Sequence, residues 1–369
     1  MKIAVATDVT TRGGVDTYIR FLIHSLVSQG HDVSLIMEAR SGSDAGRDLH
    51  HTVEVVRIPL YRRWHDQAQI LESCDAVLSS IDPEGVHVVT GSPRSCLILR
   101  ERVIRRGINL VITESQVKES ESFTPAERDE IRASYEAALG VIFVSRGNRA
   151  AMREALGGWG ERARAQVVPN GVDSSGLSRL GEGGGQLRVP GRLVSVARLS
   201  PEKSLSTLID AMALLPASLV SQLDIFGTGP EEEHLSARIK LHGLESRVRL
   251  LGWSRDVTRK LSSYDLFVLP SVAEGMPYAL LEALAVGLPV VATDIPGNAE
   301  ALDNGAAGVL VPIRQPHALA AAIQDSFGNT EATMQRVRAG IALVRREHDI
   351  DSRMAQVLGI WDRGLQSGR

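Results

Sequence analysis

Two carboxylates stand near the start of one short apolar helix in the second half of the sequence. The helix is predicted at 278–286, and Glu282 is its one charged residue. Because the helix is apolar on all sides it should be buried, and a buried carboxylate needs a partner. Pro277 suits the first helical position, which places Glu274 just ahead of a helix N-terminus that favours an anion. Carboxylates and an anion-binding loop are therefore expected to share one small region.

Two cations occupy an equivalent place earlier in the same half. Arg198 and Lys203 flank the sequence RLSPEK between a predicted strand and a predicted helix, where both could meet one phosphate group. Gly227, in FGTGP, ends another strand and lets a ligand approach the backbone. Each signal alone is explained equally well by an ordinary surface residue. Together with Glu274 and Glu282, they favour a ligand that carries phosphate and hydroxyl groups.

Alternating apolar strands and helical patterns place these residues on two parallel β-sheets. A chain of 369 residues exceeds what one core usually supports, so two domains are expected. The stretch 174–191, rich in glycine and serine, indicates a linker. The alternation is typical of doubly wound α/β domains, which bind ligands at the carboxyl ends of their strands. Strands are expected at 2–7, 32–37, 53–58, 86–90, 108–113, 140–144 and 166–168, then at 192–197, 219–226, 248–251, 266–269, 289–293 and 308–311. Helices are expected between the strands, among them one at 255–264, and helices at 331–347 and 350–365 close the chain.

The composition argues against several classes of function. The 41 basic and 44 acidic residues give a net charge of −3, which does not indicate a nucleic-acid-binding protein. Cys74 and Cys96 lack the spacing of zinc ligands and indicate reduced core residues of a cytoplasmic protein. No apolar run reaches about 18 residues, so the chain is expected to be soluble. Neither a dinucleotide fingerprint nor a P-loop is present, and the D-x-D at 349–351 indicates a helix cap rather than a metal site.

The order of the sequence blocks resembles a known family. Glu274 and Glu282, separated by seven residues in EGMPYALLEALAVGLPVVATDIPG, resemble the E-x7-E signature of retaining glycosyltransferases with the GT-B fold, particularly glycosyltransferase family 4. A bare pair of this spacing occurs by chance in many helices, whereas the full order of blocks is specific. The further blocks are GGVDTYIRFLIHSL, VIFVSRGNRAAM, VVPNGVD, VARLSPEKSLSTLIDA, DIFGTGPEEEHL, VRLLGW, YDLFVLPSVAEG and PGNAEAL.

The resemblance implies two Rossmann-like domains that face a central cleft. The first would span 1–173 and regain the returning helix 350–369, and the second, donor-binding domain would span 192–349. Arg198 and Lys203 match the pair that binds the donor's diphosphate. Glu274 matches the glutamate that contacts hydroxyls of the donor sugar, and Glu282 the one that holds the ribose. The other donor-binding positions implied are Gly13 and Gly14 in a first-domain glycine loop, Gly227, Gly252 and Trp253 near the base, and the loop of Gly275, Met276 and Pro277.

The family transfers a sugar from a nucleotide-sugar, which is a substrate and not a cofactor, with retention and without a metal. One position departs from its pattern. Family members usually carry a histidine after the strand corresponding to 108–113, where this chain has Glu114-Ser115-Gln116. Either Glu114 or Ser115 would supply the missing polar contact, and Glu114 is taken as a candidate catalytic residue. Alternatively, the site has an altered donor preference or has lost activity. A working enzyme is favoured because the donor site is intact.

Acceptors in this family are glycans, lipid-linked sugars or small molecules, and the sequence does not distinguish among them. A basic cluster would suit a peripheral contact with anionic lipid at the inner membrane face, although such clusters are usually a solvated surface. Other GT-B enzymes, a nucleotide-sugar epimerase or a phosphorylase, and a catalytically weak donor-binding partner protein remain as alternatives. The cations of the cluster are Arg62, Arg63, Arg100, Arg102, Arg105 and Arg106.

Overall fold

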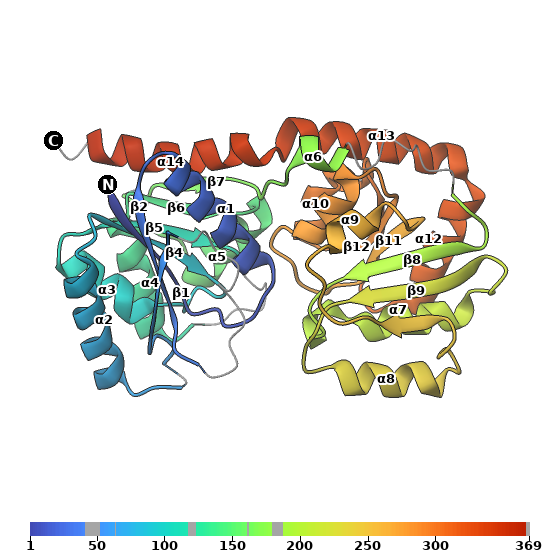
Figure 1. Ribbon diagram of the computed structural model, residues 1–369, viewed down its shortest axis with the longest axis horizontal. Coiled ribbons are helices and arrows are strands. Elements are labelled where there is room, and N and C mark those ends of the chain that lie inside the picture. Colours follow the sequence, from blue (N-terminus) through green and yellow to red (C-terminus); the bar gives the residue numbers. More distant parts are fainter. Residues whose placement is uncertain (41–51, 63, 117–122, 161, 179–186, 367–369) are drawn as a thin grey trace. The chain divides into compact units, whose positions relative to one another are not determined.

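The computed structural model describes residues 1–40, 52–62, 64–116, 123–160, 162–178 and 187–366 (Figure 1). The chain divides into two compact units. Unit 1 comprises Met1–Asn170 and Ser352–Arg369, and unit 2 comprises Gly171–Asp351. Unit 1 therefore ends three residues before the predicted boundary at 173. It resumes at Ser352, two residues after the predicted start of the returning helix at 350.

Unit 1 is built on a seven-stranded sheet with the order β3-β2-β1-β4-β5-β6-β7, and every strand pair in it is parallel. The strands form where the sequence has short apolar runs, because a parallel sheet is covered on both faces. They are β1 (Lys2–Thr7), β2 (Asp32–Glu38), β3 (Glu54–Ile58), β4 (Gly85–Thr90), β5 (Asn109–Glu114), β6 (Gly140–Phe143) and β7 (Ala165–Val167), and the helices between them are α1 (Gly14–Ser28), α2 (Gln67–Ile81), α3 (Leu97–Arg105), α4 (Pro125–Ala137) and α5 (Arg146–Leu156).

Unit 2 repeats the architecture with a six-stranded parallel sheet of order β10-β9-β8-β11-β12-β13. Both sheets are doubly wound, as the sequence predicts. The strands are β8 (Gly191–Val196), β9 (Val220–Phe226), β10 (Val248–Leu250), β11 (Leu266–Leu269), β12 (Val290–Thr293) and β13 (Val309–Val311), and the helical elements are α6 (Ser174–Ser178), η1 (Pro201–Lys203), α7 (Leu205–Leu214), α8 (Glu232–Leu241), α9 (Val257–Leu261), α10 (Tyr278–Ala285), α11 (Pro296–Ala301), η2 (Asp303–Gly305), α12 (Pro316–Gly328) and α13 (Thr330–Glu347).

The last helix, α14 (Ile350–Gln366), packs on unit 1 (Figure 1). Its Trp361 side chain is buried and lies against Gly85 at the start of β4, where a Cβ would collide with the indole ring. The Ile360 side chain lies in the same way against Gly140 at the start of β6. The absence of a side chain at these two glycines therefore leaves room for two large side chains of α14 to pack against the starts of β4 and β6.

Two elements differ from the prediction. Residues 174–178, predicted as part of a linker, form the short helix α6, which contacts α10 and α13 within unit 2. The rest of the predicted linker, 179–186, lies outside the described residues. A helix predicted at 255–264 is reduced to the five residues of α9. A pocket lies beside this short helix.

Candidate functional site

Lys203 and Glu274 meet at the carboxyl edge of the unit 2 sheet. The Lys203 Nζ atom lies 2.7 Å from Glu274 Oε1, and the Ser271 hydroxyl donates to the same oxygen at 2.7 Å. Lys203 ends the turn η1 after β8, whereas Ser271 and Glu274 follow β11. Parallel strands β8 and β11 are neighbours, so the chain brings together residues that are 71 positions apart. The side chains of Lys203 and Glu274 are only 16% and 9% exposed, which strengthens their attraction.

Arg198 follows the same strand, β8, and makes a second ion pair. Its Nη2 atom donates to Glu202 Oε1 at 2.7 Å, and the Ser200 hydroxyl donates to the same oxygen at 2.7 Å. The Arg198 Nε atom also donates to Ser200 Oγ at 3.3 Å. Burial raises the pKa of the Glu202 carboxyl, but the hydrogen bonds from Ser200 and Arg198 outweigh it and lower the pKa to about 2.

Backbone hydrogen bonds connect the loops that carry these residues. The Val272 N–H donates to the Glu202 carbonyl at 2.8 Å, and the Gly227 N–H donates to the Gly252 carbonyl at 2.8 Å. Gly227 has a φ of 143°, and a Cβ there would collide with the Ala197 carbonyl oxygen, so only glycine fits. The loops after β8, β9, β10 and β11 thus form one connected edge.

The loop before α10 holds three of the predicted donor-binding positions, and a fourth, Glu282, lies in the helix itself. Gly275, Met276 and Pro277 are buried, and Pro277 is the N-cap rather than the first helical residue, which corrects the prediction. Glu282 lies one turn into α10 and is half-buried. Gly297, in α11, approaches the loop so closely that a Cβ would collide with the Glu274 and Gly275 carbonyl oxygens.

A pocket of about 460 Å³ lies on the unit 2 sheet between α9 and the strands β8, β9 and β10. Trp253 lies in its wall and is 45% exposed, and Gly252 before it has a φ of 67°, in the left-handed region that favours glycine. The pocket combines cations with aromatic rings. Its lining consists of Arg192, Asp224, Phe226, Arg249, Leu251, Trp253, Ser254, Lys260, Ser263 and Tyr264.

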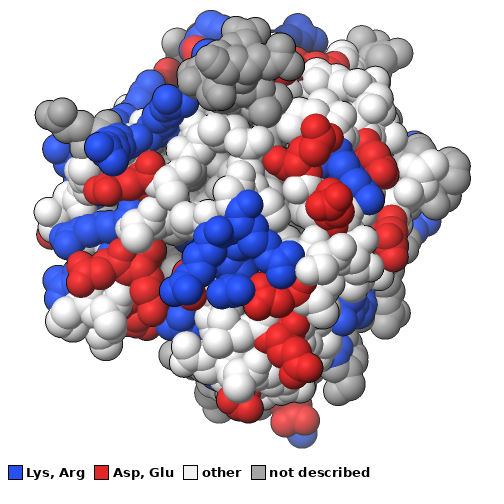
Figure 2. Space-filling model, turned by 90° about the vertical axis from the view of Figure 1, so that its left-hand side faces the viewer, with Lys and Arg blue, Asp and Glu red and all other residues white. Residues whose placement is uncertain are grey.

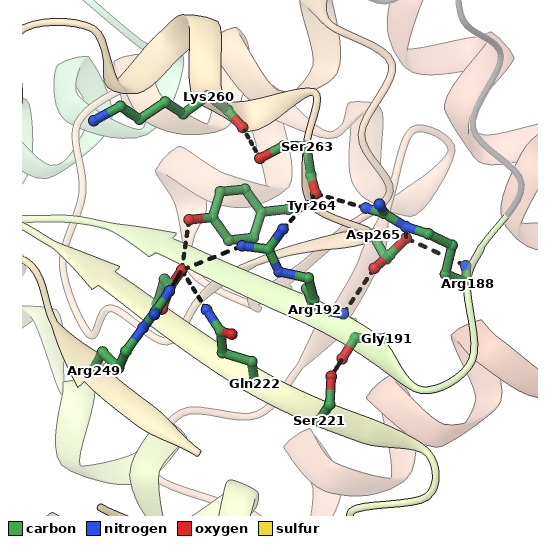
Figure 3. Close-up of polar contacts among 11 residues, drawn as sticks. Arg188, Gly191, Arg192, Ser221, Gln222, Arg249, Lys260, Ser263, Tyr264 and Asp265 are labelled. Atoms are coloured by element: carbon green, nitrogen blue, oxygen red, sulfur yellow. Dashed lines mark hydrogen bonds and ion pairs between the residues drawn. The ribbon is translucent and has the colours of Figure 1, made fainter. Parts of the chain in front are cut away.

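A polar network closes the base of this pocket. The Asp224 carboxylate is buried and accepts hydrogen bonds from Arg249 Nε at 2.7 Å and Nη2 at 2.8 Å, from the Tyr264 hydroxyl at 2.7 Å and from Gln222 Nε2 at 2.7 Å (Figure 3). Burial raises the pKa of the Asp224 carboxyl, but these hydrogen bonds outweigh it and hold the pKa below its usual value. The guanidinium of Arg192 stacks over the Tyr264 ring, 4.9 Å from its centroid. Because Asp224 is saturated with donors, the pocket offers a ligand chiefly cations and aromatic faces.

In unit 1, the predicted glycine loop lies at the start of α1. Gly13 is the N-cap of α1 with an extended backbone, and Gly14 is its first residue. A Cβ at Gly13 would have no heavy atom within 4 Å. Among the described residues, no side chain crowds this helix N-terminus, and a helix N-terminus favours an anion.

Glu114 lies inside unit 1 rather than at its surface. Its carboxylate is fully buried and accepts hydrogen bonds from the Tyr135 hydroxyl at 2.8 Å and the Thr90 hydroxyl at 2.7 Å. The Nη2 atom of Arg100 also donates to it at 3.5 Å. These contacts favour a structural role, so a catalytic role for Glu114 stays a prediction that its surroundings do not support. Ser115, the other candidate, has a buried hydroxyl with no hydrogen-bond partner among the residues that the structure describes.

The basic cluster predicted on the surface of unit 1 does not include Arg100. The Arg100 side chain is fully buried and pairs with Glu114. Asp75 accepts hydrogen bonds from both Arg102 at 2.8 Å and Arg106 at 2.9 Å, and these bonds lower the pKa of its carboxyl. In Figure 2, blue and red side chains lie side by side over much of this face. Acidic partners therefore balance much of the positive charge. Further pairs join Arg105 to Glu101 and Arg62 to Glu130, and Arg63 lies outside the described residues.

The described residues contain no helix that is long and apolar enough to cross a membrane. They also contain no group of three or more His, Cys, Asp or Glu side chains that could hold a metal ion. Asp349 of the D-x-D instead accepts a hydrogen bond from the Ser174 hydroxyl at 3.0 Å. Cys74 and Cys96 are buried free thiols, as predicted, and burial raises the pKa of both.

Two doubly wound units in one chain are the arrangement of the GT-B fold, and solved structures match it. Anabaena Alr3699/HepE in complex with UDP has a TM-score of 0.79 at 20% identity, covering 98% of this chain and 100% of that one. WaaG, a glycosyltransferase involved in lipopolysaccharide biosynthesis, has a TM-score of 0.72 at 18% identity, covering 96% of this chain and 98% of that one.

The chain belongs to glycosyltransferase family 4. The family model described as Glycosyltransferase Family 4 matches residues 12–175, and the one described as Glycosyl transferases group 1 matches residues 190–329. A phosphatidyl-myo-inositol mannosyltransferase of Mycobacterium leprae is 31% identical over 243 residues, covering 64% of this chain and 63% of that protein. A putative colanic acid biosynthesis glycosyltransferase, WcaL, of Salmonella typhimurium is 34% identical over 183 residues, covering 46% of this chain and 45% of that protein. The chain thus matches about half the length of these curated relatives.

Several residues of the candidate site were not identified from sequence. Glu202 accepts from Arg198, Ser271 donates to Glu274, and Asp224 accepts from Arg249 in the pocket. Glu202 lies between Arg198 and Lys203 and could have been noticed as a carboxylate four residues after an arginine. Ser271 is a serine three residues before Glu274, which is no distinctive pattern, and Arg249 lies 25 positions after Asp224 on another strand, so neither residue carries a sequence signal.

Proposed function

We propose that this chain is a retaining glycosyltransferase that moves a sugar from a nucleotide-sugar donor to a hydroxyl of a glycan, lipid-linked or small-molecule acceptor. The observation that carries the proposal is the contact of Lys203 with Glu274 at the carboxyl edge of the unit 2 sheet, with Arg198 on the same loop. This edge is where doubly wound sheets bind ligands. Support also comes from family 4 membership and from the nucleotide named in the HepE complex.

The proposed roles follow from the charge that develops in the reaction. Cleavage of a sugar–phosphate bond leaves negative charge on a diphosphate, and Arg198 and Lys203 are the cations that would stabilise it. Because they supply positive charge at that point, the proposal needs no metal or cofactor. Glu274 would then accept hydrogen bonds from donor-sugar hydroxyls, and Glu282 from the ribose. Retention would follow from front-face attack, in which the leaving phosphate takes the acceptor's proton.

The pocket beside α9 suits the base of the donor. Trp253 and Phe226 offer aromatic faces for stacking, and Lys260 and Ser254 offer hydrogen-bond donors. The loop before α10 would place its backbone N–H groups toward the phosphates and sugar, and the glycine loop at Gly13 would meet the diphosphate or the acceptor from unit 1. We propose a cytoplasmic location. A peripheral contact with anionic lipid gains little support from a basic surface whose arginines are paired.

The direct test is turnover with a panel of UDP-, GDP- and ADP-sugars. Release of the nucleoside diphosphate should depend on an added acceptor, and NMR of the product should show the donor's anomeric configuration. Lys203→Ala should lower kcat by about 100- to 1000-fold, which corresponds to about 2.7–4 kcal/mol of lost electrostatic stabilisation. The control is Lys240→Ala, an exposed lysine on α8, which should change kcat by less than about twofold.

The departure at Glu114-Ser115 favours one alternative, a donor-binding partner protein with weak catalysis. Such a protein would bind a nucleotide-sugar and release no diphosphate with any acceptor. Inversion of the anomeric configuration would instead contradict the retaining mechanism and leave the transferase class intact.

A further inference from the structure

Glu202 lies in the turn η1 between the two cations and has been given no role in the proposed reaction. Its Oε1 atom accepts from Arg198 Nη2 and from Ser200 Oγ, each at 2.7 Å, and Ser200 Oγ in turn lies 3.3 Å from Arg198 Nε. We infer that Glu202 is a positioning residue that holds the Arg198 guanidinium in place for the diphosphate of a donor. This inference rests on the proposed function.

The main chain of η1 fixes the carboxylate before any ligand binds. The Lys203 N–H donates to the Ser200 carbonyl at 2.9 Å, and the Ser204 N–H donates to the Pro201 carbonyl at 3.1 Å. The Glu202 carbonyl accepts from the Val272 N–H at 2.8 Å, which connects the turn to the loop that carries Glu274. Glu202 is therefore held through both its backbone and its side chain.

The arginine needs such a support more than its neighbour does. The Arg198 side chain is 45% exposed, whereas that of Lys203 is 16% exposed and held by Glu274. A long exposed side chain loses rotamer freedom when it binds an anion, and a prior ion pair removes part of that loss. The Glu202 side chain is only 19% exposed, and its pKa of about 2 keeps it ionised at neutral pH. It thus gives Arg198 a rigid charged anchor.

A competing interpretation makes the opposite prediction. If Glu202 occupied Arg198 as a substitute for phosphate, its removal would free the arginine and tighten diphosphate binding. The second donor, Ser200, argues for the anchor, because its hydroxyl donates to the carboxylate and also accepts from Arg198 Nε, so it supports both members of the ion pair. The sign of the change in affinity therefore decides between the two.

The test is calorimetric binding of UDP, GDP and ADP, and of the three matching nucleosides, to the full chain. Glu202→Ala should lower the affinity for the diphosphate that the wild type binds most tightly by about tenfold, which corresponds to about 1.4 kcal/mol. The affinity for the matching nucleoside should not change. Glu202→Gln should recover part of the loss, because its amide oxygen still accepts both hydrogen bonds. Glu233→Ala, at an exposed glutamate of α8, is the matched control and should bind like the wild type.

A double-mutant cycle shows whether Glu202 acts through Arg198. In an Arg198→Ala background, adding Glu202→Ala should change diphosphate affinity by less than about twofold. The inference would be overturned if Glu202→Ala lowered diphosphate affinity equally in the wild-type and Arg198→Ala backgrounds. It would also be overturned if Glu202→Ala left diphosphate affinity unchanged or raised it. If Glu202→Ala does not fold, Glu202→Gln decides, because wild-type or tighter diphosphate binding by it would also overturn the inference. A wild-type chain that binds none of the diphosphates would overturn the proposed function and the inference with it.

Discussion

Glu114 shows how a carboxylate at the end of a strand can face the interior of a domain. It is buried with Arg100, and both side chains are fully shielded from solvent. Removing one member of a buried pair leaves the other charge without compensation, which typically costs about 3–5 kcal/mol. We therefore expect Glu114→Ala to lower the free energy of unfolding of unit 1 by about that amount, measured by urea denaturation.

Glu101→Ala is the control for this prediction. Glu101 pairs with Arg105 on the surface of α3, and exposed pairs contribute about 1 kcal/mol or less. Equal stabilities of the two variants would contradict a structural role for Glu114. A loss of turnover by Glu114→Gln at unchanged stability would restore it as a catalytic candidate.

Asp8, directly after β1, gives unit 1 a pH dependence. Burial raises the pKa of its carboxyl to about 6, although the Ser95 hydroxyl and the Arg100 charge act in the opposite direction. Between pH 3.8 and about 6, the Asp8 carboxyl therefore holds a proton in the native state that it has lost in the unfolded state. Stability from this group is complete below pH 3.8 and decreases as the pH rises through about 6.

Asp8→Asn should accordingly stabilise the protein at pH 8 by up to about 3 kcal/mol and have little effect at pH 3.5. Denaturant unfolding at the two pH values measures the difference. A gain of the same size at both would show that proton binding by Asp8 is not its cause.

Whether a site residue could be predicted from the sequence depends on where its interaction partners lie in the chain. Arg198, Lys203 and Glu274 were found from sequence because each follows a recognisable strand. Arg100 was misassigned to the surface because its partner, Glu114, belongs to another element, and helical spacing alone does not show which arginine faces inward. The Asp224 network escaped prediction for the same reason, since it joins β9 to Arg249 on β10 and to Tyr264 just ahead of β11.

Most elements were predictable because strands covered on both faces leave apolar runs. β1 and β11 match their predicted ranges at both ends. The errors occur where local pattern is weak: α6 is a five-residue helix of serine, glycine and leucine, and α9 ends early in a segment with no side-chain cap at its N-terminus. The pocket beside α9 could therefore not be predicted.

The approach of α11 to the loop before α10 gives a prediction for that loop. Gly297→Ala would place a methyl group against the Glu274 and Gly275 carbonyl oxygens, and overpacking of this kind costs about 1–3 kcal/mol. We expect this loss in unfolding free energy, together with a higher KM for the donor because the loop must move. Gly328→Ala is the control, since a Cβ there meets nothing within 4 Å. Unchanged KM and stability in Gly297→Ala would exclude a supporting role for α11.

Among the described residues, each unit has a buried hydrophobic cluster of its own, and the chain passes between the units twice. The second connection follows α13 and delivers α14 to unit 1, so unit 1 is completed only by the end of the described chain. The alternating pattern of the sequence predicted two sheets, and the resemblance to a family predicted the returning helix. Spacing alone did not show what α14 would contact, because the glycines that receive it, Gly85 and Gly140, lie more than 200 residues earlier.

This arrangement predicts that the two units lose stability separately. A chain ending at Asp351 would remove from unit 1 the buried side chains of Met354, Val357, Leu358, Ile360 and Trp361. Loss of a single large core side chain costs about 2–5 kcal/mol, and a domain is stable by about 5–15 kcal/mol, so unit 1 should unfold. Unit 2 keeps its whole core and should retain its thermal transition, together with any stabilisation by a nucleoside diphosphate. Calorimetry of the shortened chain, with Trp361→Ala as a milder version, measures both transitions. Two transitions at wild-type temperatures would show that unit 1 does not depend on α14.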